Sequence, residues 1–194
     1  MNENEEYLDA FRAGDSATAR ALVARRASEA GFCVGPVFHG TDSEFFVFKY
    51  TEDIGFHFGP KKAAEMRIAQ AEMTDGAKIV EAYLAISSPL RLPDLFTWSP
   101  ASVRRALADV GIDIGDGEAD RECICDALSA HGFDGIVYEN ATEGGGDSYI
   151  VFRPEAIRLA DAFVVDGRGM PVGLDERFAP GCDIRGKNPY LPLL

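Results

Sequence analysis

The stretch "VFHGTDSEFFVFKY", residues 37–50, opens with apolar residues and then reads His39-Gly40-Thr41. Apolar residues ending at a glycine indicate a short strand, because Gly40 allows the chain a tight exit. The pattern therefore predicts that His39 lies at a strand end. Phe45, Phe46 and Phe48 are expected to pack in the core.

A second histidine follows in "DIGFHFGPKKAAE", residues 53–65. The segment IGFHF predicts another short strand, and Pro60 is typical of the first turn of a helix. We therefore expect His57 at a strand end just before a helix N-terminus, where unpaired backbone N–H groups favour anions.

The rest of the chain alternates helices and strands without an internal repeat. Helical patterns cover residues 5–29 with an interruption at Gly14, residues 99–110 and about residues 120–131. Residues 77–87 form the longest strand candidate, and the segments 133–140 and 148–154 predict two short strands around the loop "ATEGGGD". This order predicts an α+β fold with mixed or antiparallel strands.

Composition narrows the class of protein. The chain has 194 residues, 46% hydrophobic composition and a net charge of −13. The length suggests one domain, and the charge disfavours broad binding to nucleic acid or to anionic membranes. The acidic N-terminus and the lack of a long apolar run predict a cytoplasmic protein, or one delivered into a host cytoplasm without a cleaved signal peptide. Three histidines and four scattered cysteines offer no metal-ligand set.

Three motifs in order, "FHGT", "GFHF" and "GDSYIVF", resemble the ADP-ribosyltransferase fold. The similarity is to the branch with an H-Y-E type signature, which includes diphtheria-like toxins and poly(ADP-ribose) polymerases. It is closer still to the small transferase-like domains of phage and mobile-element polyvalent proteins. The resemblance covers roughly residues 36–158.

The resemblance implies split mixed or antiparallel sheets with flanking helices over residues 32–163. A helical lead-in over residues 1–31 and an irregular C-terminal tail over residues 164–194, packed on the domain, would complete the chain. The implied activity is NAD-dependent mono-ADP-ribosylation of a macromolecular acceptor, foremost a protein, with release of nicotinamide. A role as a phage toxin or effector is implied with it.

The resemblance also implies roles for individual residues. His39 would bind a ribose 2′-hydroxyl, the Gly40 backbone would bind the nicotinamide amide, and Thr41 would contact the second ribose. His57 stands where the family has a tyrosine that stacks on nicotinamide. The implied NAD-binding set is His39, Gly40, Thr41, Phe56, His57, Phe58 and Arg67.

The catalytic acid is where the sequence departs from the family pattern. Aligning "SYIVF" with the family's "EYIVY" puts Ser148 in the place of the catalytic glutamate. Asp147, Glu143 and Glu139 are the carboxylates within reach, and a bulge, or a strand that starts only at Ser148, would be needed to turn Asp147 inward. A carboxylate matters because loss of nicotinamide builds oxocarbenium character on the ribose. The candidate catalytic residues are His39, His57, Asp147, Ser148 and Glu143.

Other interpretations stay open on the sequence alone. Asp147 and Ser148 are also residue types that satisfy backbone groups in a turn before a strand. The same fold could hydrolyse NAD as a glycohydrolase toxin, or serve as a catalytically inactive NAD-binding or interaction module of a phage or mobile element. Removal of a 2′-phosphate from RNA, by a related NAD-dependent fold, is disfavoured by the acidic composition.

Overall fold

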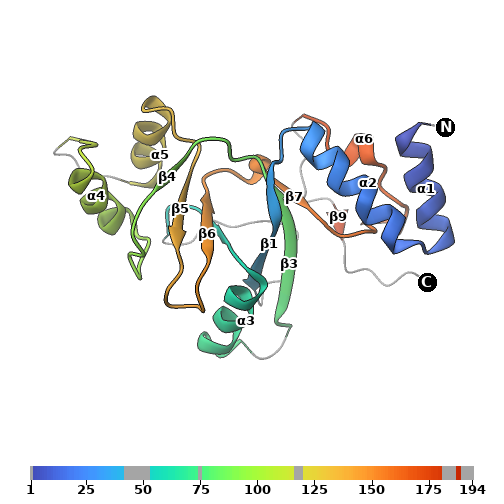
Figure 1. Ribbon diagram of the computed structural model, residues 1–194, viewed down its shortest axis with the longest axis horizontal. Helices are drawn as coiled ribbons and strands as arrows, with labels where there is room; N and C mark the ends of the chain where they lie inside the picture. The colour runs from blue at the N-terminus through green and yellow to red at the C-terminus, as the bar shows by residue number, and fades with distance from the viewer. Residues whose placement is uncertain (1, 42–52, 74–75, 116–119, 181–186, 189–194) are drawn as a thin grey trace.

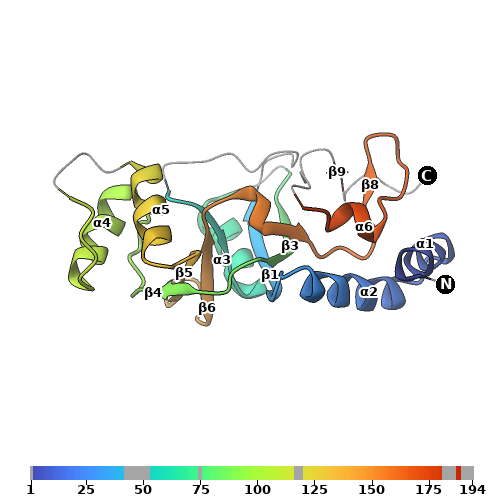
Figure 2. The ribbon, with the colours of Figure 1, turned by 90° about the horizontal axis from the view of Figure 1, so that it is seen from above.

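The computed structural model describes residues 2–41, 53–73, 76–115, 120–180 and 187–188. Its described part has the predicted α+β fold, with two main sheets set side by side and helices at both ends (Figures 1 and 2). One sheet is antiparallel and has the strand order β1-β3-β7. The other has the order β2-β6-β5-β4 and is mixed, because only β4 and β5 are parallel in it. The strands of these two sheets are β1 (Val34–Thr41), β2 (Phe56–Phe58), β3 (Lys78–Leu84), β4 (Pro89–Arg91), β5 (Gly135–Glu139), β6 (Asp147–Val151) and β7 (Ile157–Leu159).

A two-bond bridge joins the sheets where the first two motifs meet. The Phe38 N–H donates to the Gly59 carbonyl at 2.8 Å, and the Gly59 N–H donates to the Phe38 carbonyl at 2.9 Å. Phe38 lies in β1 and Gly59 directly follows β2, so the two motifs are held together by backbone hydrogen bonds.

Helix α3 (Lys61–Gln70) packs on β1 through a glycine. A Cβ at Gly40 would come within 2.6 Å of the Ala64 carbonyl oxygen and 3.0 Å of the Ile68 side chain. Only a residue without a side chain allows this close approach. Pro60 is the N-cap of α3, one position earlier than the sequence suggests.

The mixed sheet is covered by α4 (Pro100–Asp109) and α5 (Arg121–Ala130), both near the positions expected from their periodicity. Ser99 and Asp120 cap them by accepting hydrogen bonds from Ser102 N–H and Cys123 N–H. The core between these helices and the sheet includes Trp98, Leu107, Ile124, Leu128, Ile136, Tyr138 and Ile150.

The opposite end of the molecule combines N-terminal and C-terminal segments of the chain (Figure 2). Helices α1 (Glu3–Ala13) and α2 (Ser16–Glu29) meet at Gly14, as predicted, and share a core with the short helix α6 (Leu174–Arg177). The buried Arg177 guanidinium donates to the Tyr7 hydroxyl at 3.0 Å and to the carbonyls of Leu159 and Asp161 at 2.8 and 2.9 Å.

The structure differs from the sequence-based prediction at several short segments. Residues 89–91, expected to end a strand, form β4. The segment 154–160 is expected to be a turn or one helical turn; its first three residues form one 3-10 turn, but the strand β7 that follows was not predicted. The expected irregular tail contains α6 and a ribbon of β8 (Val165–Asp166) with β9 (Lys187–Asn188). The predicted packing of residues 45, 46 and 48 lies outside the described residues. Among the described helices, none is long and apolar enough to cross a membrane.

We expect Arg177→Leu to lower the free energy of unfolding by roughly 2 to 4 kcal/mol, because it leaves the Tyr7 hydroxyl and two buried carbonyls without their donor. Chemical denaturation followed by circular dichroism measures this loss. The matched control is Arg168→Leu, since Arg168 is 87% exposed and contacts only the nearby Asp166 in the ion pairs of the described chain. Equal stability of the two variants would contradict the structural role of Arg177.

Candidate functional site

The two histidines of the first motifs lie next to each other. The His39 Nδ1–H donates to the His57 carbonyl at 2.7 Å, so the His39 ring presents Nε2 as an acceptor. Burial lowers the pKa of His39, against the effect of this hydrogen bond, and the nearby Arg67 charge lowers it further. His39 is thus a neutral imidazole whose orientation is fixed by the backbone of the second motif.

His57 faces an aromatic group on the mixed sheet. Its Nδ1 lies 3.2 Å from the Tyr138 hydroxyl, and its ring lies edge-on to Trp98 and Tyr138 at centroid distances of 6.0 and 6.1 Å. Burial first, and then the charges of His39 and Arg67, lower the pKa of His57 to about 3. His57 is therefore neutral at physiological pH.

The remaining ring nitrogen of His57 is buried and has no hydrogen-bond partner among the described residues. The Oδ2 atom of the Asp53 carboxylate lies 3.7 Å from it. A buried polar atom without a partner is uncommon in folded proteins and is a place where a ligand can complete the hydrogen bonding.

Ser148 points toward this same face of the sheet. Tyr138 and Ser148 are direct partners in the β5–β6 ladder, and Ile150, two residues later, pairs with His57. Alternate residues share a face, so the side chains of His57, Tyr138 and Ser148 lie together. Ser148 is only 2% exposed, and a Cβ at Gly59 would come within 2.4 Å of its hydroxyl oxygen.

A chain of side chains leads from Ser148 to Glu143. The Asn140 amide donates to the Ser148 hydroxyl at 3.2 Å and to the Glu143 carboxylate at 2.8 Å. The Glu143 N–H donates back to the Asn140 side-chain oxygen at 2.9 Å. The carboxylate of Glu143 is thereby held at the edge of the site.

Asp147 lies on the other face of β6. The strand begins at Asp147 and pairs with β5 without a bulge, so adjacent Asp147 and Ser148 point in opposite directions. The Asp147 carboxylate makes two hydrogen bonds to the Arg91 guanidinium at 2.9 and 2.7 Å. This arrangement turns Asp147 away from the histidines, in contrast to the inward orientation that a bulge would give.

The site carries negative charge around Tyr138. Burial raises the pKa of the Tyr138 phenol, and the charges of Glu143, Asp94 and Asp53 raise it further. Asp94 is tied to the Glu143 loop, because its Oδ2 accepts a hydrogen bond from the Thr142 hydroxyl at 3.1 Å. Three carboxylates beside a buried aromatic group favour a cationic ligand or a transition state with positive charge.

The other predicted binding residues lie close to the histidines but have packing roles. Phe56 and Phe58 are 5% and 1% exposed and belong to the core between the sheets, with the Phe58 ring 5.4 Å from His39. Gly40 is fixed by its contact with α3, and Thr41 is buried at the end of β1. Arg67 is exposed on α3, near enough to lower the pKa of both histidines.

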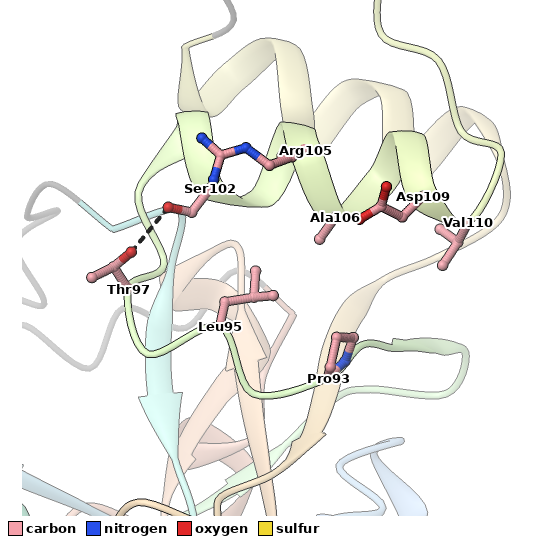
Figure 3. Close-up of a pocket in the computed structure, with 8 residues that line it drawn as sticks. All are labelled: Pro93, Leu95, Thr97, Ser102, Arg105, Ala106, Asp109 and Val110. Atoms are coloured by element: carbon pink, nitrogen blue, oxygen red, sulfur yellow. Dashed lines mark hydrogen bonds between the residues drawn. The ribbon is translucent and has the colours of Figure 1, made fainter.

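A separate hollow of about 350 Å³ lies between α4 and the segment that follows β4 (Figure 3). Its lining residues include Leu95, Arg105 and Asp109, and Thr97 hydrogen-bonds Ser102 at 2.9 Å at one side of it. No residue of the predicted NAD-binding or catalytic sets lines it.

Five residues of the site were not predicted from the sequence: Asp53, Asp94, Trp98, Tyr138 and Asn140. Alternation in "FDGIVYEN" puts Tyr138 on the face of Ile136, which is a usable signal. Asn140 precedes a glycine-rich loop, a common place for a side chain that satisfies backbone groups. No sequence feature marks Trp98 as a site residue except its position directly before Ser99, the N-cap of α4.

The split sheets joined at His39 and His57, with β6 next to β2, define an ADP-ribosyltransferase-like domain. Residues 34–163, about two thirds of the chain, match the family described as ADP-ribosyltransferase in polyvalent proteins. The chain belongs to this family, as the sequence resemblance predicted. Comparisons with curated proteins and with solved structures give no match.

The low pKa of His57 predicts an acid-dependent loss of stability. The unfolded chain binds a proton at this histidine near pH 6.5, whereas the folded protein does so only near pH 3. Stability from this group is therefore complete above pH 6.5 and falls as the pH drops toward 3, by at most about 1.4 kcal/mol per pH unit.

We expect His57→Gln to flatten the decrease in unfolding free energy between pH 6.5 and 4.5, measured by urea denaturation at several pH values. Comparison with the unchanged protein cancels the contributions that other titrating groups make to the pH dependence. One such group is Asp161, because burial raises its pKa to about 6. Identical slopes in the two proteins would show that His57 is already protonated in the folded state.

Proposed function

We propose that this protein binds NAD at the His39–His57 site and transfers ADP-ribose to a macromolecular acceptor. The observation that carries the proposal is the contact of the two motif histidines, together with a carboxylate, Glu143, that Asn140 holds by the third motif, in a member of an ADP-ribosyltransferase family. Mono-ADP-ribosylation of a protein is the form of the reaction that we propose.

The polar atoms of the site suit NAD. The Nε2 of His39 is an acceptor that matches a ribose hydroxyl, and the unpartnered ring nitrogen of His57 can bind a polar group of the ligand. The nicotinamide ring of NAD is cationic, and Asp53, Asp94 and Glu143 supply negative charge in its favour. The exposed Arg67 on α3 supplies a cation for the diphosphate.

Glu143 is the proposed catalytic acid group, in the role that Asp147 cannot fill from its ion pair with Arg91. The bond between ribose C1′ and the nicotinamide nitrogen breaks, and its electron pair neutralises the ring. The acceptor nucleophile forms a new bond to C1′ and gives up its proton to the carboxylate or to water. Glu143 stabilises the positive charge that develops on the ribose.

A second candidate is a catalytically inactive NAD-binding module. Ser148 occupies the register of the family glutamate, and it is 2% exposed and engaged by Asn140. Binding of NAD without release of nicotinamide would favour this candidate. Release of free ADP-ribose in the absence of any acceptor would instead indicate a glycohydrolase and a toxin that depletes NAD.

We expect the purified protein to bind NAD in isothermal titration calorimetry, and His39→Ala to weaken binding roughly tenfold through loss of one hydrogen bond. His131→Ala is the matched control, because His131 ends α5 and bonds only the Ala127 carbonyl through its Nδ1. Absence of binding at millimolar NAD would overturn the proposal.

We expect Glu143→Gln to lower kcat for nicotinamide release by roughly 10²–10³-fold, because it removes one electrostatic group from the transition state. Glu155→Gln, on the turn after β6, is the control for a neutralised surface glutamate. Asp147→Asn tests the rival carboxylate. Loss of activity from Asp147→Asn with full activity in Glu143→Gln would contradict the assignment.

A further inference from the structure

The buried side chain of Asn140 makes hydrogen bonds to both Ser148 and Glu143. It directly follows β5, is 3% exposed and also closes the loop with its backbone, whose N–H donates to the Gly146 carbonyl at 2.9 Å. Its carbonyl accepts the Gly145 N–H at 2.7 Å. Side chain and backbone therefore fix Asn140 relative to the third motif.

The orientation of the Asn140 amide is determined by Glu143. The Glu143 N–H can only donate, so the side-chain atom it contacts at 2.9 Å is the amide oxygen. The Glu143 carboxylate can only accept when ionised, so the atom at 2.8 Å from it is the amide nitrogen. The second hydrogen of that nitrogen points to the Ser148 hydroxyl oxygen at 3.2 Å.

The direction of hydrogen bonding continues along the sheet. Ser148 lies directly opposite Tyr138 in the β5–β6 ladder, so the two side chains share one face of the sheet. Because Ser148 accepts from Asn140, its own hydrogen is available to the Tyr138 hydroxyl oxygen. The Tyr138 hydrogen is then available to His57 Nδ1, 3.2 Å away.

We propose that Asn140 is a positioning residue that holds the Glu143 carboxylate and, through Ser148 and Tyr138, sets the tautomer of His57 with its proton on Nε2. The effect of Asn140 on catalysis rests on the proposed function, whereas the hydrogen-bond geometry does not. Ser148, which occupies the position of the family glutamate, therefore links the Glu143 carboxylate to the His57 imidazole.

The series of hydrogen bonds from Asn140 through Ser148 and Tyr138 to His57, called the relay below, gives the two neighbouring histidines opposite tautomers. His39 carries its proton on Nδ1, where it bonds the His57 carbonyl. His57 carries its proton on Nε2, the buried atom that has no partner among the described residues, and this atom can donate to a bound substrate.

Nitrogen-15 NMR of the full chain without any ligand tests the relay directly, because ring nitrogen shifts separate protonated from unprotonated nitrogens. The chain has three histidines, and His57→Gln assigns the signals of His57. We expect a single Nε2-protonated tautomer in the unchanged protein and a tautomer mixture in Ser148→Ala. Ser129→Ala is the matched control, since Ser129 bonds only the Cys125 carbonyl within α5.

Kinetics test the positioning of Glu143. Asn140→Asp keeps an oxygen that can accept from the Glu143 N–H, loses both donated hydrogen bonds and places a second carboxylate beside that of Glu143, so the Glu143 carboxylate is no longer held. We expect kcat for nicotinamide release to fall about 100-fold, with KM for NAD changed less than threefold, as for a displaced catalytic group. In a Glu143→Gln background, Asn140→Asp should lower kcat less than threefold, because the carboxylate that Asn140 positions is already absent.

The outcomes separate this inference from the proposed function. An Nδ1-protonated His57, or an unchanged His57 spectrum in both Ser148→Ala and Asn140→Asp, overturns the relay whether or not NAD is turned over. If Asn140→Asp lowers kcat as much in the Glu143→Gln background as in the unchanged protein, the two effects are independent and the positioning role of Asn140 is wrong. If the protein fails to bind NAD while the His57 spectra change as expected, the proposed function fails and the relay stands.

Discussion

Two backbone hydrogen bonds between Phe38 and Gly59 join the two sheets, and the candidate site depends on them. They hold the end of β1 beside the end of β2, so that His39 reaches the His57 carbonyl at 2.7 Å. The glycine is needed there, because a side chain at 59 would collide with Ser148. The same contact thus brings the first, second and third motifs together.

The strand ends that carry the two histidines and the α+β class could be predicted because they follow from local patterns. Short apolar runs ending at Gly40 and Gly59 indicate strand ends, and the order of elements indicates an α+β fold with mixed or antiparallel strands. The split of the strands into two sheets was implied by the family resemblance. The strands β4 and β7 were missed because each has three residues, and their pairing partners lie far away in the sequence. Pairing of this kind depends on tertiary packing that no short window contains.

The sequence reduced the choice of the catalytic carboxylate to a few candidates but did not identify one. Alternation already placed Asp147 and Ser148 on opposite faces, and the structure supplies the reason that no bulge reverses them: Arg91 binds the Asp147 carboxylate with two hydrogen bonds. The position of Glu143 depends on the amide of Asn140 within a loop of three glycines. A loop of that composition has too many accessible backbone conformations for its side chains to be placed from sequence.

The packing of α1 and α2 on α6 has a topological consequence for the region matched by the family. That region runs from residue 34 to residue 163, and the segments on either side of it are joined through Tyr7 and Arg177. This contact connects residues 170 positions apart in the sequence and so holds the two flanking segments together. Because both segments contribute to one hydrophobic core, neither can leave the domain without exposing apolar side chains of the other.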